Sequence, residues 1–286
     1  MRKRIILGVL TLTLLVGGLV GCGSKDADKS AANKTATPVV TKAADDNQGS
    51  DKDLLAQIKE RGKLLIGTEG TYAPYTFHDE SGKLVGYDVE VAEAIAAKLG
   101  VKAEFVESNW DSLIAGLDAV RYDVVINQVT ITEERLQKYD FSTPYTISRA
   151  ALIVGKDNND IKSFEDLKGK KAAQGLTSNY AQLAEGYGAK LVSADGSFSK
   201  AIELVSTKRA VATINDQVSF YDFLKQKPDA PVKLVDTLDD ASKNAVLIRK
   251  GNDTFVEAVN KALDEITKDG TLAKISDKYF GADVTK

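Results

Sequence analysis

Histidine and cysteine are almost absent from this chain, which has one of each, His78 and Cys22, among its 286 residues. Zinc sites of the Cys/His type need several such ligands, and a Ser-His-Asp triad would have to use the single histidine. Three motifs are also missing: Gly-x-x-x-x-Gly-Lys-Ser/Thr, Gly-x-Gly-x-x-Gly and Gly-x-Ser-x-Gly. The sequence therefore predicts no metal, no cofactor and no catalytic residue, and it disfavours an enzyme.

Basic blocks are missing too, apart from a short run at the N-terminus. The formal net charge is −3, and residues 1–21 hold three basic residues and no acidic one. The remaining chain therefore carries 35 basic and 41 acidic residues, a net charge of −6. Nucleic-acid binding relies on clustered positive charge. A mildly acidic chain without such a cluster argues against nucleic acid as a partner.

The N-terminus, by contrast, has a recognisable pattern. Basic residues 2–4 precede an uncharged, mostly apolar run, residues 5–20. This run is shorter than the roughly 20 apolar residues that a membrane-spanning helix needs. A basic start, an apolar centre and a small residue before the cut are typical of a secretory signal, which we place at residues 1–21.

Cys22 follows Leu19-Val20-Gly21, and this segment resembles the lipobox of bacterial lipoproteins. The resemblance implies a lipid on Cys22 that anchors the chain to the outer face of the cell membrane. An ordinary signal or an anchor helix with an incidental cysteine is the alternative. Residues 22–52 are small and polar with few branched side chains, so they cannot bury enough apolar surface to fold, and we expect a flexible tether.

The rest of the chain, about 235 residues, suffices for one large or two modest domains. Short apolar strands alternate with segments whose apolar residues have the helical period of 3.6, and Asp88 is expected to cap one of these helices. The same alternation of strand and helix begins again after residue 154. Strands are predicted at 64–67, 83–87, 102–106, 123–127, 171–174, 190–192 and 211–214, and helices at 88–99, 111–117, 179–185, 199–205 and 219–225. Two apolar stripes near the C-terminus indicate core-facing helices. This pattern predicts two α/β units with mainly parallel sheets.

Two α/β units favour a ligand at the carboxyl ends of the strands, in a cleft between domains. Beyond that, six segments in order resemble the polar amino acid-binding family of ABC transporter solute-binding proteins: residues 71–75, 86–90, 110–117, 130–135, 141–145 and 269–272. The resemblance spans roughly residues 54–280. It implies a monomeric two-lobed Venus-flytrap fold (periplasmic-binding-protein-like, type II) with hinge crossings near 147–148 and 243–244. Lobe I would be residues 53–147 plus 243–286, and lobe II residues 148–242.

The same resemblance implies a binding site. Arg135 matches the arginine that forks onto the α-carboxylate of the ligand, and Asp216 matches the acid that receives the α-ammonium group. Thr130 would help to hold the carboxylate. The remaining matches are Asn127 and Gln128 at the ligand backbone, Tyr72 and Trp110 as walls, Glu69 toward the ligand side chain, and Thr177, Ser178 and Asn179 as N–H donors. The last three depart from the family's more common Gly-Thr pattern.

The identity of the ligand rests on details of the resemblance. Residues 127–130, 138–145 and 280–286 look closest to the cystine-binding branch, so L-cystine is the expected ligand, delivered to an ABC transporter permease. Another polar amino acid, such as glutamine, glutamate or a basic one, is an alternative. Two alternatives of a different class are an exported enzyme similar to cyclohexadienyl dehydratase and a ligand-sensing module.

Overall fold

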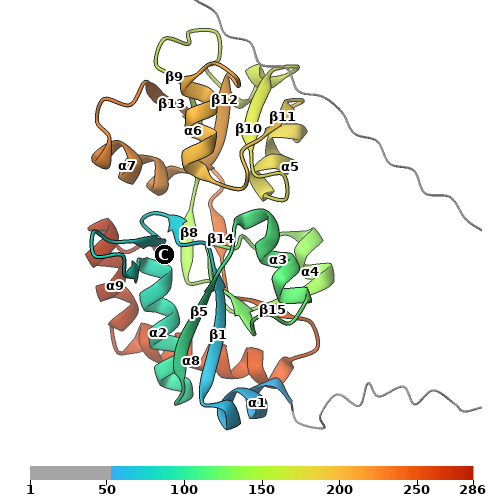
Figure 1. Cartoon of the computed structure of the whole chain (residues 1–286), viewed down its shortest axis with the longest axis vertical. Coiled ribbons are helices and arrows are strands. Elements are labelled where there is room, and N and C mark those ends of the chain that lie inside the picture. The colour runs from blue at the N-terminus through green and yellow to red at the C-terminus, as the bar shows by residue number, and fades with distance from the viewer. Residues whose placement is uncertain (1–52, 286) are drawn as a thin grey trace, which may run out of the picture. The chain divides into compact units, whose positions relative to one another are not determined.

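The computed structural model describes residues 53–285. The predicted signal peptide, the tether and Cys22 lie outside the described residues. Two five-stranded sheets form the centres of two lobes, which two further strands connect (Figure 1). Among residues 53–285, no helix is both long enough and apolar enough to cross a membrane.

The first sheet has the strand order β5-β1-β6-β15-β7. Strand β1 pairs in parallel with β5 and β6, whereas β15 pairs antiparallel with β6 and β7. Its strands are β1 (Lys63–Thr68), β5 (Lys102–Glu107), β6 (Val124–Val125), β7 (Tyr139–Phe141) and β15 (Leu247–Arg249). The helices of this lobe are α1 (Leu54–Arg61), α2 (Tyr87–Leu99), α3 (Trp110–Asp118), α4 (Glu133–Lys138), α8 (Asp253–Lys268) and α9 (Thr271–Phe280). A small sheet adds β2 (Thr71–Tyr72), β3 (Thr76–His78) and β4 (Leu84–Val85).

The second sheet repeats this pattern with the order β11-β10-β12-β9-β13. Strand β10 pairs in parallel with β11 and β12, and β9 pairs antiparallel with β12 and β13. Its strands are β9 (Ala150–Gly155), β10 (Lys171–Gln174), β11 (Lys190–Ser193), β12 (Ala212–Asp216) and β13 (Val232–Thr237). The helices are α5 (Asn179–Gly186), α6 (Phe198–Ser206), α7 (Gln217–Gln226) and the 3-10 turn η1 (Phe164–Leu167). One strand in each sheet runs against the other four, which agrees with the mainly parallel sheets predicted.

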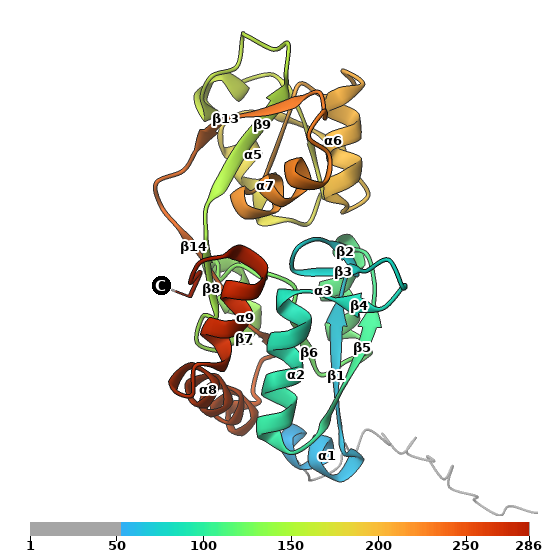
Figure 2. The ribbon, with the colours of Figure 1, turned by 90° about the vertical axis from the view of Figure 1, so that its left-hand side faces the viewer.

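Two strands carry the chain between the lobes. Strands β8 (Thr146–Ser148) and β14 (Ser242–Asn244) pair antiparallel with each other and belong to neither large sheet (Figures 1 and 2). The predicted crossings near 147–148 and 243–244 fall within them. After β14 the chain returns to the first sheet through β15, and α8 and α9 pack against α2 of the same lobe.

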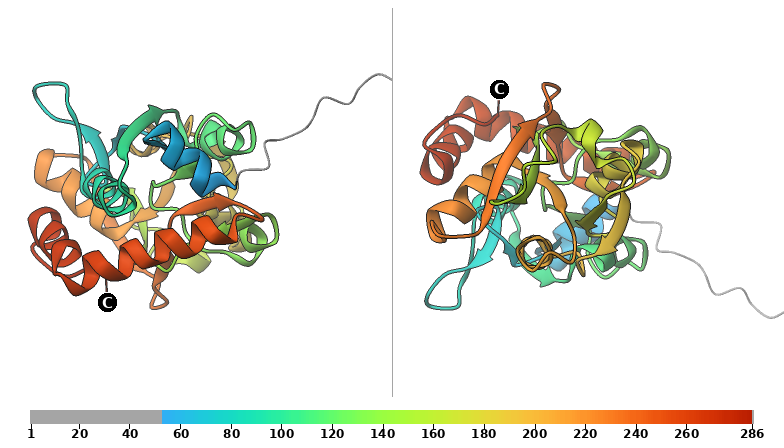
Figure 3. Two further views of the ribbon diagram at one scale, coloured as in Figure 1. Left: turned by 90° about the horizontal axis from the view of Figure 1, so that it is seen from below. Right: turned by 90° about the horizontal axis from the view of Figure 1, so that it is seen from above.

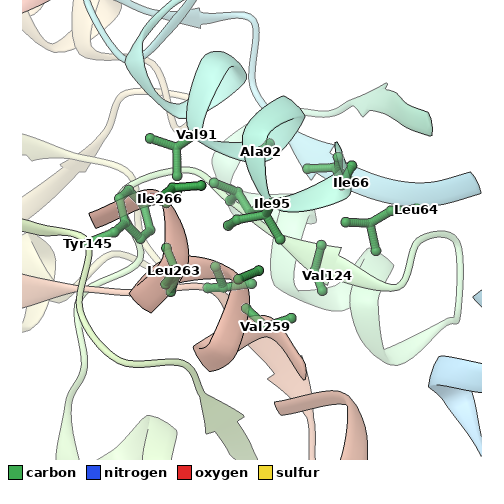
Figure 4. Close-up of a cluster of buried hydrophobic side chains, with 14 of the residues drawn as sticks. Leu64, Ile66, Val91, Ala92, Ile95, Val124, Tyr145, Val259, Leu263 and Ile266 are labelled. Carbon is green, nitrogen blue, oxygen red and sulfur yellow. The ribbon is translucent and has the colours of Figure 1, made fainter. Parts of the chain in front are cut away.

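The core of lobe I lies between its sheet and helices α2 and α8. Ile66 and Val124 of the sheet pack with Ile95 of α2 and with Val259 and Leu263 of α8 (Figure 4). Helix α8 runs along one end of this lobe and contacts α1 (Figure 3, left). The apolar stripe of α8 is buried as predicted, because its members recur every three or four residues on one helix face.

One local prediction is wrong. Helix α2 starts at Tyr87 after Gly86, and no side chain caps it, although the sequence favoured Asp88 as the cap. Asp88 is instead buried, and its carboxylate accepts hydrogen bonds from the backbone and side-chain amides of Gln128 at 2.8 Å and 2.7 Å. A tertiary partner 40 residues away therefore replaces the local capping interaction.

Candidate functional site

A pocket lies between the two lobes, at the carboxyl ends of β1, β6, β10 and β12. The empty space between its lining atoms is about 590 Å³, part of which opens to solvent. The lining residues are Glu69, Tyr72, Trp110, Asn127, Gln128, Gln174, Gly175, Ser178, Asn179, Tyr180, Gly196, Ser197, Phe198, Ala201, Asn215, Asp216 and Asn244.

Glu69 and Asn127, which follow β1 and β6, hold each other in place on the lobe I wall. The backbone N–H of Glu69 donates to Asn127 Oδ1 at 2.8 Å, and Asn127 Nδ2 donates to Glu69 Oε2 at 2.6 Å. Burial raises the pKa of Glu69 to about 8, although the hydrogen bond from Asn127 lowers it. Glu69 is thus a buried acid with an elevated pKa that faces the pocket.

Gln128 connects the pocket to both crossing strands. Its backbone has a left-handed φ of 51°, which is uncommon for a residue other than glycine. The backbone N–H and the side-chain amide of Gln128 both donate to the carboxylate of Asp88. Its Oε1 accepts a hydrogen bond from Asn244 Nδ2 of β14 at 2.8 Å. Gln128 Nε2 also donates to Thr146 Oγ1 of β8 at 3.2 Å. Pocket wall and hinge strands therefore share one buried hydrogen-bond network.

Arg135, on α4, has its guanidinium 5.5 Å from the ring centroid of Trp110. Its Nη1 donates to the carbonyl oxygen of Thr130 at 2.9 Å, and Thr130 Oγ1 donates to Asn244 Oδ1 at 2.9 Å. Arg135 is only 8% exposed, and burial lowers its pKa to about 10. Within residues 53–285 it forms no ion pair, and the adjacent Glu134 pairs with Lys138. A buried positive charge without a counter-ion is costly unless a ligand supplies one.

Asp216 lies on the lobe II wall, where it ends β12 and caps α7. Its Oδ1 accepts from the backbone N–H groups of Val218 and Ser219 at 2.9 Å and 3.1 Å. Across the cleft, the hydroxyl of Tyr75 donates to the same oxygen at 2.7 Å. Burial raises the pKa of Asp216, although these hydrogen bonds lower it. The pocket therefore has a buried carboxyl group opposite lobe I.

Further hydrogen bonds join the lobes around the pocket. Tyr72 Oη donates to Asn215 Oδ1 at 2.8 Å. Thr177 donates through its backbone N–H and its hydroxyl to Asp111 Oδ1 at 3.2 Å and 3.0 Å. These contacts require the two walls to be close together, so the structure shows a closed arrangement of the lobes.

Most of the site residues expected from the sequence line this pocket. They are Glu69, Tyr72, Trp110, Asn127, Gln128, Ser178, Asn179 and Asp216. Thr130 and Arg135 are not among the lining residues: Arg135 lies over the Trp110 ring, and Thr130 bonds to Arg135 and to Asn244. Thr177 points to Asp111 instead of lining the pocket.

Several lining residues were not anticipated, most of them in lobe II: Gln174, Gly175, Tyr180, Gly196, Ser197, Phe198, Ala201, Asn215 and Asn244. Gln174 and Asn215 stand at the carboxyl ends of β10 and β12, a position that the sequence pattern alone could have indicated. Gly196 and Ser197 form the turn before α6, and nothing local marks them as pocket residues.

Two α/β lobes with antiparallel crossings and a polar pocket between them define a two-lobed binding protein. The family model of bacterial extracellular solute-binding proteins, family 3, matches residues 64–282, and the chain belongs to this family. The chain is 47% identical to the L-cystine-binding protein TcyA of Bacillus subtilis (strain 168), over 100% of both chains. The resemblance inferred from the six segments is thereby confirmed.

Solved structures agree with the fold predicted from the sequence, a periplasmic-binding-protein-like fold of type II. An ancestral arginine-binding protein bound to arginine superimposes with a TM-score of 0.73 and 44% identity, over 77% of this chain and 99% of that one. The L-cystine solute receptor of Neisseria gonorrhoeae, unliganded and open, gives a TM-score of 0.53 at 47% identity, over 80% and 99%. The family is described as one of bacterial extracellular solute-binding proteins.

Proposed function

We propose that this chain is an extracytoplasmic lipoprotein that captures a polar amino acid, L-cystine in particular, and delivers it to an ABC transporter. The observation that carries the proposal is the charge arrangement at the pocket. Buried Arg135, which forms no ion pair within the described residues, lies beside one wall, and buried Asp216 forms part of the other. An amino acid zwitterion supplies the complementary carboxylate and ammonium groups.

The roles of the remaining residues follow from where they lie. Trp110 and Tyr72 offer flat apolar surfaces to the ligand, and Asn127 and Gln128 offer amides that their own hydrogen bonds orient. Ser178 and Asn179 stand at the start of α5, where free backbone N–H groups favour a negatively charged group. Thr130 acts by orienting Arg135.

Capture occurs by closure of the lobes. Ligand contacts available only in the closed form shift the population toward it. The two structural comparisons support this view. At similar identity, the arginine-bound protein superimposes better than the open, unliganded receptor, as expected if the lobes of this chain are closed. The lobe boundaries that we propose are residues 53–147 plus 243–286 and residues 148–242.

L-cystine is favoured among amino acids because two of the relatives described above are, by name, a binding protein and a receptor for L-cystine. A thermal-shift panel of the detergent-solubilised full-length chain tests this choice. A ligand at 100 times its Kd adds about 2.7 kcal/mol of stability, which raises Tm by roughly 2–4 °C per kcal/mol. The panel comprises L-cystine, glutamine, glutamate, arginine and prephenate.

The outcomes separate the alternatives. A shift with cystine alone supports the proposal, and a shift with another amino acid keeps the binding protein but replaces the ligand. A shift with prephenate, together with its turnover to phenylpyruvate, would favour the dehydratase-like enzyme. Genes for a permease and an ATPase beside this one would favour transport over sensing.

The lipid anchor is tested separately, through Cys22. We expect the wild-type chain in the membrane fraction and the Cys22→Ala chain in the released fraction, because acyl chains supply the membrane affinity. The mass of the N-terminal peptide would show the lipid directly. Equal fractionation of both chains and an unmodified peptide would contradict the anchor.

A further inference from the structure

Two hydrogen-bond donors in the pocket have no partner. Among residues 53–285, three buried side-chain nitrogen or oxygen atoms lack one: Trp110 Nε1, Gln174 Nε2 and Thr213 Oγ1. Only Trp110 and Gln174 line the pocket. Buried donors in native proteins are nearly always paired, so two unpaired N–H groups at one cavity indicate that a ligand completes them.

The two donors belong to opposite lobes, and Gly175 connects them: it follows Gln174 in the sequence and lies against the Trp110 ring. Gln174 is the last residue of β10 and is 3% exposed. A β-carbon at Gly175 would lie 3.5 Å from Trp110 Cδ1, the ring atom bonded to Nε1. At Gly196, a β-carbon would lie 3.0 Å from Trp110 Cβ. These two glycines let the lobe II wall reach the indole, so the residue that follows Gln174 lies directly beside the Trp110 ring.

Neither donor is occupied by the two acids of the pocket. Glu69 Oε2 accepts from Asn127, and Asp216 Oδ1 accepts from Tyr75 and two backbone N–H groups. The ligand's α-carboxylate is assigned to Arg135, on the other lobe from Gln174. Both donors therefore lack a protein partner, and Gln174 lies on the lobe opposite the proposed α-carboxylate site, where it can meet a second acceptor group of the ligand.

We propose that Gln174 Nε2 and Trp110 Nε1 form a second subsite, which binds a carboxylate at the far end of an amino acid with two head groups. The proposal rests on the proposed function and extends it to specificity. These two N–H groups can donate to a carboxylate but cannot accept a hydrogen bond from a cation, so they favour a double-headed amino acid such as L-cystine over one with a cationic side chain.

The test compares two ligands that differ only at the distal carboxylate: L-cystine and the mixed disulfide of L-cysteine and cysteamine. Affinities are measured by calorimetry on the detergent-solubilised full-length chain. The unmodified chain should prefer L-cystine by about 10- to 100-fold, the range expected for hydrogen bonds to a charged group. Gln174→Met keeps the size of the side chain without its donor, so most of that preference should be lost.

A second variant tests the Trp110 donor, and a control variant tests whether a Gln→Met change by itself alters the preference. Trp110→Phe removes Nε1, and the preference for L-cystine should fall by a smaller factor. Since both ligands share the α-amino acid head group, any change in the stacking of Arg135 cancels in the ratio. Gln137→Met makes the same chemical change as Gln174→Met at an exposed residue and should leave the ratio unchanged.

Several results would overturn the subsite. If Gln174→Met weakens both ligands equally, Gln174 serves the α-head group and the distal subsite is wrong. An unchanged ratio in a folded Gln174→Met chain would overturn it as well; if that chain fails to fold, an unchanged ratio in Trp110→Phe does so. If the unmodified chain binds neither disulfide but binds another amino acid, the proposed ligand fails first, and the subsite fails with it.

Discussion

The two walls of the pocket are built differently, although the two sheets share one pairing pattern. On lobe I the side chains of Glu69, Asn127 and Gln128 are held by hydrogen bonds within that lobe or to the hinge strands. On lobe II, Gln174 has an unpartnered donor, as Trp110 has on lobe I, and Asp216, which two backbone N–H groups of its own lobe hold, also accepts a hydrogen bond across the cleft from Tyr75. The difference suggests that lobe I presents a preorganised surface and that lobe II completes the site on closure.

Among the variants that test this difference between the lobes, Arg135→Ala should reduce the affinity for the amino acid most. If lobe I supplies the main anchor, the loss of a buried charge partner should weaken amino acid binding by about 3–5 kcal/mol. Calorimetry with L-cystine measures the change. Arg209→Ala, at an exposed position of lobe II, is the control and should bind as the wild type does. Wild-type affinity in Arg135→Ala would show that the anchor lies elsewhere.

The pH dependence of stability tests whether burial of Glu69 is as strong as the structure indicates. The pKa of Glu69 rises from 4.5 to about 8 on folding, so the folded chain retains a proton that the unfolded chain releases. Its contribution to stability is therefore complete below about pH 4.5 and declines toward pH 8, by at most about 1.4 kcal/mol per pH unit.

Glu69→Gln separates this contribution from those of Asp88 and Asp216, whose pKa values burial also raises. The thermal unfolding midpoint (Tm) of the ligand-free wild type should decrease as the pH is raised from 5 to 8. The variant should show a smaller decrease over the same range. Parallel profiles of the two proteins would mean that Glu69 is ionised in the folded state.

Asp216→Asn probes the lobe II side of the comparison. Asparagine keeps an oxygen for the N–H groups that Asp216 caps on α7, so the helix should remain. The lost charge should weaken binding by about 1.5–3 kcal/mol if this group accepts the ligand's ammonium. Calorimetry with L-cystine measures the loss, and an affinity equal to the wild type would remove Asp216 from the site.

Gly196→Ala should have the smallest effect, and it acts on closure. Gly196 has φ +73°, and a β-carbon there would lie 3.0 Å from Trp110 Cβ on the other lobe. We expect binding to weaken by about 1–2 kcal/mol, with a smaller decrease in the radius of gyration on adding ligand. Gly169→Ala is a matched control, since its φ is +74° and no atom lies within 4 Å of the added carbon. Equal affinity of the two variants would exclude a steric effect on closure.

Much of the fold was predictable because it depends on local periodicity. The buried stripe of α8 and the strand at residues 171–174 follow directly from the spacing of apolar residues. Helix α2 was placed correctly, but its cap was not, because Asp88 is used by Gln128, a residue far away in sequence.

The sequence by itself determined the two-lobed α/β class and, through recognisable segments, which residues to expect around a ligand. Only the tertiary structure decided that Thr177 faces Asp111, that Gln174 carries a free donor, and that two glycines admit Trp110 to the lobe II wall. Apolar spacing is a property of neighbouring residues, so a sequence shows it directly. Contacts between the two walls of the pocket join residues of different lobes that are far apart in the sequence, so no local sequence pattern predicts them.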